Sequence, residues 1–381
     1  MKFIDEFRDR ELAHGLAAAI GRAAQPQRDY QFMEFCGGHT HAIARYGVSD
    51  LLPANVRMIH GPGCPVCVLP IGRIDMAIRL AMDEGVILCS YGDPLRVPAS
   101  GGLSLLRARA ALAGGGEIRM VYCAADALRL AQENAQRQVV FFAIGFETTT
   151  PPTAVVIRQA RALGLRNFSV LCCHVLTPAA IASILESPEV RQWGSVRLDG
   201  FIGPAHVSTI IGSRPYEFFA AEYRKPVVIA GFEPLDVMQA ILMLIAQLNS
   251  GRAVVENEFA RAVTREGNRK AQRMVAEVFE LRRSFAWRGL GELPYSALRI
   301  RREFADYDAE RRFPISYQAV PDHPACECGA VLRGARRPQD CRIFGSVCTP
   351  ENPVGSCMVS SEGACAAHYS FGRFADAKVA P

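Results

Sequence analysis

The sequence lacks the long apolar runs and the blocks of like charge that mark membrane proteins and nucleic-acid-binding proteins. Its longest apolar stretches, VVFFAIGF and VMQAILMLIAQL, are much shorter than the ~20 residues of a membrane-spanning helix. It has no long run of like charges, and the charged N-terminal segment has no apolar signal-peptide core. We therefore expect a cytoplasmic protein with no membrane partner and no nucleic-acid partner.

Three cofactor-binding motifs are also missing. The sequence contains no GxxxxGK(S/T) phosphate loop, which argues against ATP use by this chain. It contains no CxxxCxxC motif, which argues against radical chemistry with S-adenosylmethionine. Its cysteine-rich C-terminal segment lacks the paired CxxC knuckles that usually hold structural zinc.

Cysteine, in contrast, is abundant. The chain has 381 residues, of which 50% are hydrophobic and 21% charged, so we expect two or three globular domains. Its 13 cysteines are not expected to form a structural disulfide framework in a reducing cytoplasm. Metal binding or thiol chemistry is the leading explanation for them.

Apolar segments rich in β-branched residues alternate with amphipathic segments. The apolar segments predict buried strands at 56–60, 85–91, 117–123, 138–146, 168–175, 198–203 and 226–232. The amphipathic segments predict helices at 73–84, 103–112, 124–135 and 153–163. This alternation is typical of parallel sheets covered by helices.

A weak internal repeat favours two related lobes. Three segments near residues 35, 59 and 89 resemble segments about 137–142 residues later, in the same order. We therefore expect an α/β fold with two related Rossmann-like parallel-sheet lobes, followed by a loop-rich C-terminal iron–sulfur region. The motif loops would gather on one rim, because sites in such folds lie at the C-terminal ends of strands.

We expect four regions along the chain. Residues 1–135 would form a first α/β domain, completed by part of 226–300, and residues 136–225 would form a second α/β domain. Residues 226–320 would be a helical connecting region. Residues 321–381 are enriched in Cys, Gly and Pro and show no periodicity, so this region is expected to need a stabilising cross-link such as a metal cluster.

Two cysteine-containing motifs precede position 70. FCGGHTH contains Cys36, His39 and His41, which are metal-ligand types but too few for a complete site, so a fragment completed elsewhere and an accidental cluster are both open. GPGCPVC contains Cys64 and Cys67 as a CxxC pair on an expected loop. Such a pair can hold a metal or alternate between dithiol and disulfide, although an incidental pair or half a zinc knuckle is the alternative.

The C-terminal segment contains six cysteines within 40 residues, namely Cys326, Cys328, Cys341, Cys348, Cys357 and Cys365. Four thiolates around an iron–sulfur cluster would stabilise a segment that cannot bury much apolar core. Zinc, disulfides and unrelated buried thiols are the alternatives.

Polar residues also follow strands in GFETTTP and PAHVSTIIG. Glu147, the threonines and His206 could orient a thiol or a ligand, whereas ordinary helix capping by Thr150 is an equally good explanation from the spacing. The remaining polar or sulfur-containing candidates lie in apolar segments and are expected to be inert core residues, namely Cys89, Cys123, Cys172, Cys173 and His174.

Six ordered motifs in the chain resemble the HypD family of [NiFe]-hydrogenase maturation proteins. They are FCGGHTH, GPGCPVC, GFETTTP, PAHVS, GFEPLD and the C-terminal segment CRIFGSVCTPENPVGSCMVSSEGACAAHY. The resemblance implies a scaffold with redox capability on which the Fe(CN)2CO group is assembled. It also implies a complex with the small chaperone HypC and cyanide supply from HypE.

The resemblance implies roles for individual residues. The family's [4Fe-4S] ligand spacing, C-x14-C-x6-C-x16-C, falls on Cys326, Cys341, Cys348 and Cys365. Cys328 and Cys357 would then be a redox pair near the cluster. Cys36, Cys64 and Cys67 would bind the nascent iron with His39 close by, and Cys64, Cys67 and Glu147 are the catalytic candidates.

Two other readings of the residues remain open. The first is a thiol–disulfide oxidoreductase that receives electrons from its cluster, and the second is a structural zinc protein. Whether a scaffold of this kind is formally an enzyme is left undecided by the sequence.

Overall fold

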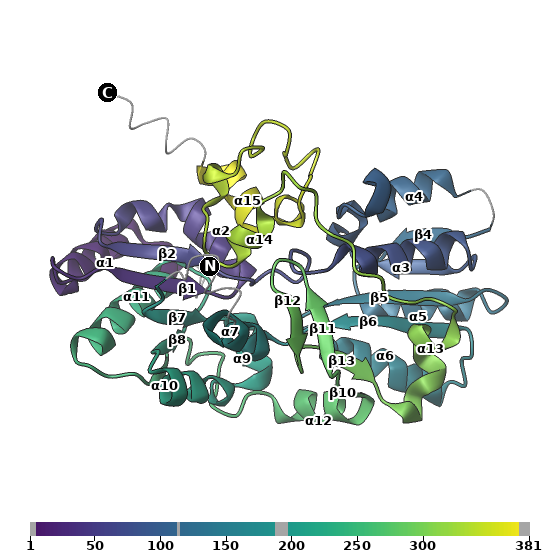
Figure 1. Cartoon of the computed structure of the whole chain (residues 1–381). Coiled ribbons are helices and arrows are strands. Elements are labelled where there is room, and N and C mark those ends of the chain that lie inside the picture. The colour runs from purple at the N-terminus through teal and green to yellow at the C-terminus, as the bar shows by residue number, and fades with distance from the viewer. Residues whose placement is uncertain (1–4, 113–114, 187–196, 373–381) are drawn as a thin grey trace.

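A computed structural model describes residues 5–112, 115–186 and 197–372, and contains two parallel β-sheets side by side (Figure 1). The strands are β1 (Tyr30–Glu34), β2 (Val56–His60), β3 (Ile87–Ser90), β4 (Glu117–Met120), β5 (Val139–Gly145), β6 (Phe168–His174), β7 (Gly200–Gly203), β8 (Val227–Ile229), β9 (Val255–Asn257), β10 (Phe279–Leu281), β11 (Ser284–Trp287), β12 (Gly291–Pro294) and β13 (Leu298–Ile300). The first sheet has the order β2–β1–β7–β8–β9 and the second the order β4–β3–β5–β6. The predicted α/β fold with two parallel sheets and a loop-rich C-terminal region is confirmed.

Helices cover both sheets. They are α1 (Arg10–Ala23), α2 (Gly37–Tyr46), α3 (Ile71–Met82), α4 (Leu105–Ala111), α5 (Ala124–Glu133), α6 (Thr150–Ala162), α7 (Thr177–Glu186), α9 (Ala205–Ile211), α10 (Glu217–Tyr223), α11 (Pro234–Asn249), α12 (Arg269–Val278), α13 (Ala309–Arg312), α14 (Cys328–Leu332) and α15 (Ala364–Ala367). Within the described ranges, none of these helices has the length and apolar character needed to cross a membrane.

The sheets are held by apolar side chains that are buried on both faces. In the first sheet, Phe32 of β1 packs with Ile20 of α1 and Ile241 of α11, and all three are fully buried. In the second sheet, every residue of the central strand β5 and of β6 is buried. Continuous burial of this kind is required of parallel strands with helices on both faces, and it explains why these strands were predictable.

The strands of the two sheets are interleaved along the chain. The strands β1 and β2 belong to the first sheet, the next four strands form the second sheet, and β7 returns to the first. The predicted boundary at residue 135 falls between β4 and β5, although both pair with β3, and residues 136–225 contribute strands to both sheets. The repeated segments that begin near 35 and 172 lie at the ends of β1 and β6, one in each sheet.

The range 226–320, expected to be helical, contains α11, α12 and the short α13 but also six strands. The strands β8 and β9 extend the first sheet. The strands β10 and β13, and likewise β11 and β12, form two small antiparallel pairs. Each of these four strands has only three or four residues, which is too short for an alternating pattern to stand out in the sequence.

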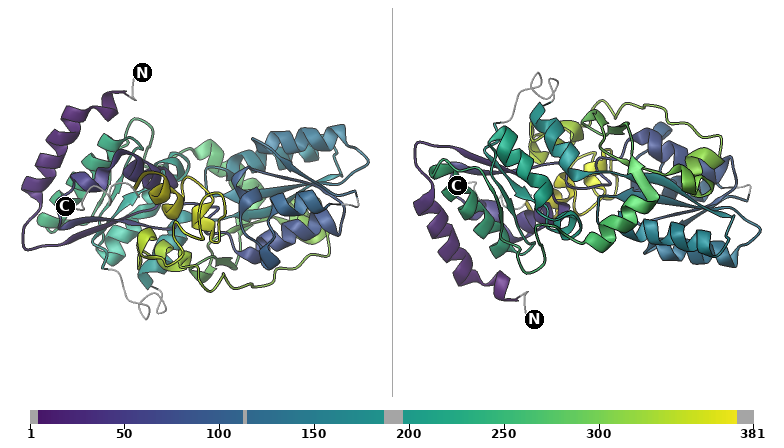
Figure 2. Two further views of the ribbon diagram at one scale, coloured as in Figure 1. Left: turned by 90° about the horizontal axis from the view of Figure 1, so that it is seen from above. Right: turned by 90° about the horizontal axis from the view of Figure 1, so that it is seen from below.

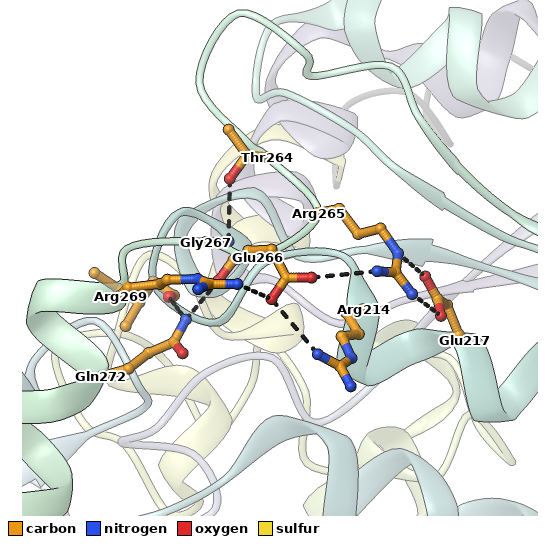
Figure 3. A network of polar contacts seen from close by, with 9 residues as sticks. Arg214, Glu217, Thr264, Arg265, Glu266, Gly267, Arg269 and Gln272 are labelled. Atoms are coloured by element: carbon orange, nitrogen blue, oxygen red, sulfur yellow. Dashed lines mark hydrogen bonds and ion pairs between the residues drawn. The ribbon is translucent and has the colours of Figure 1, made fainter.

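Polar contacts hold the segment through which the chain leaves the first sheet for α12 (Figure 3). Glu266 contacts three arginines, at 3.0 Å from Arg269 of α12, 3.2 Å from Arg265 and 3.5 Å from Arg214. Arg265 forms a two-pronged contact with Glu217 of α10, at 2.6 and 2.8 Å. Helix α12 then packs on α6 of the second sheet, so this segment links the two halves of the molecule.

The C-terminal region lies over the junction between the two sheets (Figure 2). It consists of short helical turns and loops, and α15 packs against α2 of the first sheet. Residues 373–381 of the predicted region 321–381 lie outside the described residues.

Candidate functional site

Cys36 lies directly after β1 and is the N-cap residue of α2. Its side chain is buried, and its backbone N–H donates a hydrogen bond to Glu34 Oε2 at 2.9 Å. Burial raises the pKa of the Cys36 thiol to about 12, and the carboxylate of Glu362 acts in the same direction. The backbone N–H groups of Gly38 and His206 favour the thiolate and oppose this shift. The thiol is therefore protonated at neutral pH but already faces donors that would stabilise its charged form.

A buried carboxylate that the sequence reading missed organises the start of α2. Glu34 is fully buried and accepts hydrogen bonds from Thr40 Oγ1 and, at 2.8 Å, from His60 Nδ1 at the end of β2. Together with the Cys36 N–H, these donors fix the first turn of α2 to both neighbouring strands. An acidic residue at the end of an apolar strand was the available signal, because a carboxylate is buried only where it finds donors.

Other parts of the chain occupy the space beside the glycines of the FCGGHTH motif. A Cβ atom at Gly37 would collide with the side chain of Glu362, and one at Gly38 would lie 2.5 Å from the Phe232 ring. A Cβ at Gly63, which precedes Cys64, would lie 2.5 Å from the Cys36 backbone nitrogen. The C-terminal region therefore covers this turn, and the site is closed.

His39 is fully buried and directs its Nε2 at backbone carbonyl oxygens, 2.8 Å from Gly231 and 3.1 Å from Ala230. Since carbonyls only accept, Nε2 bears the proton of the neutral ring. The Nδ1 atom is therefore a free acceptor, and it has no hydrogen-bond partner. Burial lowers the pKa of His39. His41, in contrast, packs against Phe371 of the C-terminal region, as expected for a packing residue.

Cys64 and Cys67 form a disulfide with a Cα–Cα separation of 5.2 Å. The pair lies in the loop between β2 and α3 and does not open a helix, as the sequence indicated. Ser356 Oγ donates to the Cys67 carbonyl at 2.7 Å, and a Cβ at Gly363 would lie 3.0 Å from Cys67 Sγ. Two points of the C-terminal region therefore touch the disulfide.

The six C-terminal cysteines gather in one group. Cys348 lies within electrostatic range of both Cys326 and Cys341, and Cys365 lies within range of Cys348. The Val354 N–H points at Cys348 Sγ at 3.4 Å. The four predicted cluster ligands are thus brought together.

The donor set fits an iron–sulfur cluster. Thiols with N–H groups directed at sulfur are what such clusters use, and their four thiolates are further apart than the ligands of a single ion. In the part of the chain that the structure describes, no three His, Cys, Asp or Glu side chains have the arrangement of a metal site. The ligand assignment, like that of the Cys36 group, stays a prediction.

Cys328 and Cys357 lie side by side. Cys328 is in hydrogen-bonding contact with Cys326, Cys357 and Cys365, and a Cβ at Gly355 would lie 2.5 Å from Cys328 Sγ. Contact with Cys328 lowers the pKa of Cys357, but contact with Cys365 and burial outweigh it, so that this pKa is raised. Contact with Cys328 also lowers the pKa of Cys326, to about 7. Adjacent buried thiols are compatible with a redox pair, which remains a prediction.

Glu147 follows β5 of the second sheet and faces the same junction. It accepts hydrogen bonds from the Thr177 N–H at 2.9 Å and hydroxyl at 3.0 Å, yet burial raises its pKa to about 7. The buried hydroxyl of Tyr216 neighbours the Ser208 side chain and lies within electrostatic range of both Glu147 and Cys36. Tyr216 was missed because nothing in the sequence distinguishes it from a core aromatic residue.

Two expectations about the remaining candidates need correction. Cys123 is exposed at the start of α5 and not buried. Thr150 does not cap α6, because the N-cap residue is Thr149. Neither threonine side chain accepts a capping hydrogen bond, since both hydroxyls donate to the Phe146 carbonyl at 3.1 Å. His174 is buried as expected and contacts Thr153 Oγ1 at 2.9 Å.

Comparisons with known proteins match the whole of this architecture. A family model described as HypD, hydrogenase formation hypA family, matches residues 11–372. The chain belongs to the HypD family. The hydrogenase maturation factor HypD of Cupriavidus necator is 71% identical over 376 residues, which is 99% of this chain and 98% of the relative. That of Escherichia coli is 44% identical over 376 residues, 97% of this chain and 98% of the relative.

The resemblance to the HypD family inferred from six motifs is therefore confirmed. A further relative, HypD of Azotobacter vinelandii, is 65% identical over 380 residues and covers 100% of this chain and 99% of its own. These relatives span both sheets and the C-terminal region. Membership in a family of hydrogenase maturation factors therefore applies to the complete architecture and not to one of its halves.

Proposed function

We propose that this protein is a cytoplasmic hydrogenase maturation factor that serves as the scaffold for assembling the Fe(CN)2CO group. One observation supports the proposal most strongly. Residues 362–365 contact the turn that holds Cys36 through Glu362, contact Cys67 through Gly363, and end at Cys365 in the thiol group. A single short segment thus joins an isolated thiol, a redox-active pair and a cluster-type donor set.

Cys36 would bind the iron that is being assembled. Ferrous iron with cyanide and carbonyl ligands is soft, and thiolates suit it. Because the pKa of Cys36 is raised, iron must displace a proton from this thiol, which the N–H groups of Gly38 and His206 favour. The Nδ1 atom of His39, which has no hydrogen-bond partner, would be a second ligand to the iron.

The closed arrangement explains why partners are needed. Cys36 is 6% exposed, and Glu362 lies against Gly37 beside it. We propose that a HypC-type chaperone contributes a further cysteine ligand once this turn opens, and that a HypE-type partner supplies cyanide. A site with one thiol and one imidazole then becomes complete only in the complex.

The proposed redox capability comes from two sulfur-containing groups, the Cys64–Cys67 disulfide and an iron–sulfur cluster. Reduction of the Cys64–Cys67 disulfide breaks one S–S bond, takes up two electrons and two protons, and yields two thiols that can bind iron. A [4Fe-4S] cluster held by Cys326, Cys341, Cys348 and Cys365 would exchange single electrons. Gly363 lies against Cys67 and precedes Cys365 by two residues, so the disulfide and such a cluster would lie close together.

Mössbauer spectra of the complex with its HypC and HypE partners, labelled with iron-57, test the proposal. We expect a low-spin ferrous component beside the cluster signal. Cys36→Ala should remove that component and leave the cluster signal, whereas Cys123→Ala, at an exposed thiol outside the junction, should retain both. Persistence of the low-spin component in Cys36→Ala would contradict the role of this residue.

A thiol–disulfide oxidoreductase is the second candidate, favoured by the contact between the disulfide and the C-terminal region. It predicts that the chain, supplied with an external electron donor but with no partner protein, reduces a protein disulfide and that Cys67→Ser abolishes this activity. It also predicts that Cys36→Ala leaves the activity unchanged, which separates it from the scaffold.

A further inference from the structure

A cavity of about 490 Å³ lies away from the Cys36 turn, between the loop after β3 and the C-terminal region. Its walls come from most residues of 96–107, from Ile71 and Arg288, and from residues 320, 321, 323 and 351–354. The first of these segments follows the C-terminal end of a parallel strand, where ligands of α/β proteins bind. A volume of this size suits a small molecule.

The lining is rich in hydrogen-bond donors and positive charge. Three arginines, Arg96, Arg107 and Arg288, face one acidic side chain, Glu351. Each guanidinium has five N–H donors, and the contacts of Arg96 and Arg107 use one each, to the carbonyls of Pro350 and Gly102. Both side chains are exposed, so their remaining donors are available to a ligand.

Arg288 is the unusual member of this set. Its side chain is 3% exposed, and its Nε is paired with Asp322 at 2.5 Å. Its Nη1 atom is buried and has no hydrogen-bond partner. A buried guanidinium donor without an acceptor is costly and generally indicates a bound water or anion. The Arg288 N–H donates to the Val68 carbonyl at 2.7 Å, so its backbone is anchored.

Neutral groups of the cavity are donors as well. Ser104 Oγ accepts from the Arg107 N–H at 3.2 Å, which leaves its hydroxyl proton free. His323 Nδ1 accepts from the Ala325 N–H at 3.2 Å, so the proton of the neutral ring is on Nε2. Gly101 has no side chain and a φ of 63°, so backbone is exposed in the wall. The set is suited to an acceptor-only ligand.

We propose that this cavity binds a phosphate group, free or as a small phosphate ester, held by Arg96, Arg107 and Arg288. Planar forks of N–H donors match the oxygens of phosphate, and charge-assisted bonds of this type are strong. The ligand would bridge the second sheet and the C-terminal region. This inference does not depend on the proposed iron site.

Calorimetric titration of the full chain with inorganic phosphate and with glycerol 3-phosphate, at constant ionic strength, tests the site. We expect millimolar or tighter binding, and tighter binding of the ester would identify a phosphorylated small molecule as the source. Arg107→Gln should weaken binding about tenfold, the equivalent of one charge-assisted bond. Arg109→Gln, two positions along the same helix and outside the cavity, is the matched control and should change affinity less than about twofold.

Arg288→Lys provides a second variant that keeps the ion pair with Asp322 but removes the forked donor. It should also weaken phosphate binding about tenfold while circular dichroism shows an unchanged fold. The proposal is overturned if neither phosphate probe binds the wild type at millimolar concentration. It is equally overturned if Arg107→Gln and Arg109→Gln bind phosphate with the same affinity.

Discussion

Cys172 inside the second sheet and Cys36 at the junction differ in their neighbours and not in their acidity. Burial raises the pKa of Cys172 in β6 to about 12, the same value as for Cys36. Cys172, however, donates its thiol proton to the Leu298 carbonyl at 3.5 Å within a fully packed core. Cys36 lies at a helix start, beside the Cys64 loop and the C-terminal region. A raised thiol pKa therefore indicates only burial. The position of Cys36 at a strand end, beside other cysteines, is what makes it a candidate iron ligand.

The largest expected effect separates two kinds of cysteine within the junction. Cys341→Ser should lose the visible absorbance and iron of the cluster after anaerobic purification, because a predicted ligand is removed. Cys328→Ser should retain both, because Cys328 is assigned to the redox pair. The reverse pattern in iron analysis would show that the ligand set differs from the predicted one.

The second prediction concerns Glu147, the acid at the junction end of β5. Its folded-state pKa of about 7 lies above the ordinary value of 4.5, so the folded state holds the proton more tightly than the unfolded state. The contribution of Glu147 to stability is therefore complete below pH 4.5 and is lost as the pH rises to 7. The loss amounts to about 3 kcal/mol at most.

Urea unfolding of the wild type and of Glu147→Gln between pH 4.5 and 7.5 measures this contribution. The amide keeps an acceptor for Thr177 but cannot ionise, so the variant should lack this part of the pH dependence. Glu11→Gln, at an exposed position of α1, is the control and should follow the wild type. Identical pH profiles for all three proteins would show that Glu147 ionises normally.

A smaller effect is expected at the glycines of the motif. Gly38→Ala places a methyl group 2.5 Å from the Phe232 ring and should destabilise the fold by about 2 kcal/mol through overpacking. Gly15→Ala, at an exposed position of α1 with nothing within 4 Å, should instead stabilise it by up to about 1 kcal/mol. Equal changes in the free energy of unfolding would show that Phe232 moves aside at little cost.

The sequence was sufficient to predict those features that depend on a local pattern of residues. Strands β5 and β6 are apolar throughout, so their position followed from composition, and the ordered motifs identified the family. The pairing of β7 with β1 could not be predicted, because it depends on contacts between residues far apart in the chain. The covering of Gly37 by Glu362 likewise joins positions 325 residues apart, which no periodicity records.

The polar residues missed by the sequence reading have a common cause. Glu34 and Tyr216 are defined by what surrounds them in the folded protein. Glu34 accepts hydrogen bonds from β2 and α2, and Tyr216 lies within electrostatic range of Cys36 and Glu147. Their residue types alone are unremarkable in a globular protein. Cys123 was misplaced for the opposite reason, because an apolar run does not show which of its ends reaches the surface.

Infrared spectra of the complex formed with the proposed HypC-type and HypE-type partners test the role of Cys36 most directly. Cys36→Ala and Cys172→Ala remove one buried thiol each, and the two thiols have the same raised pKa. The account predicts cyanide and carbonyl stretching bands in the wild type and in Cys172→Ala, and their loss in Cys36→Ala. Bands of undiminished intensity in Cys36→Ala would contradict the assignment of the assembly site to the turn at Cys36.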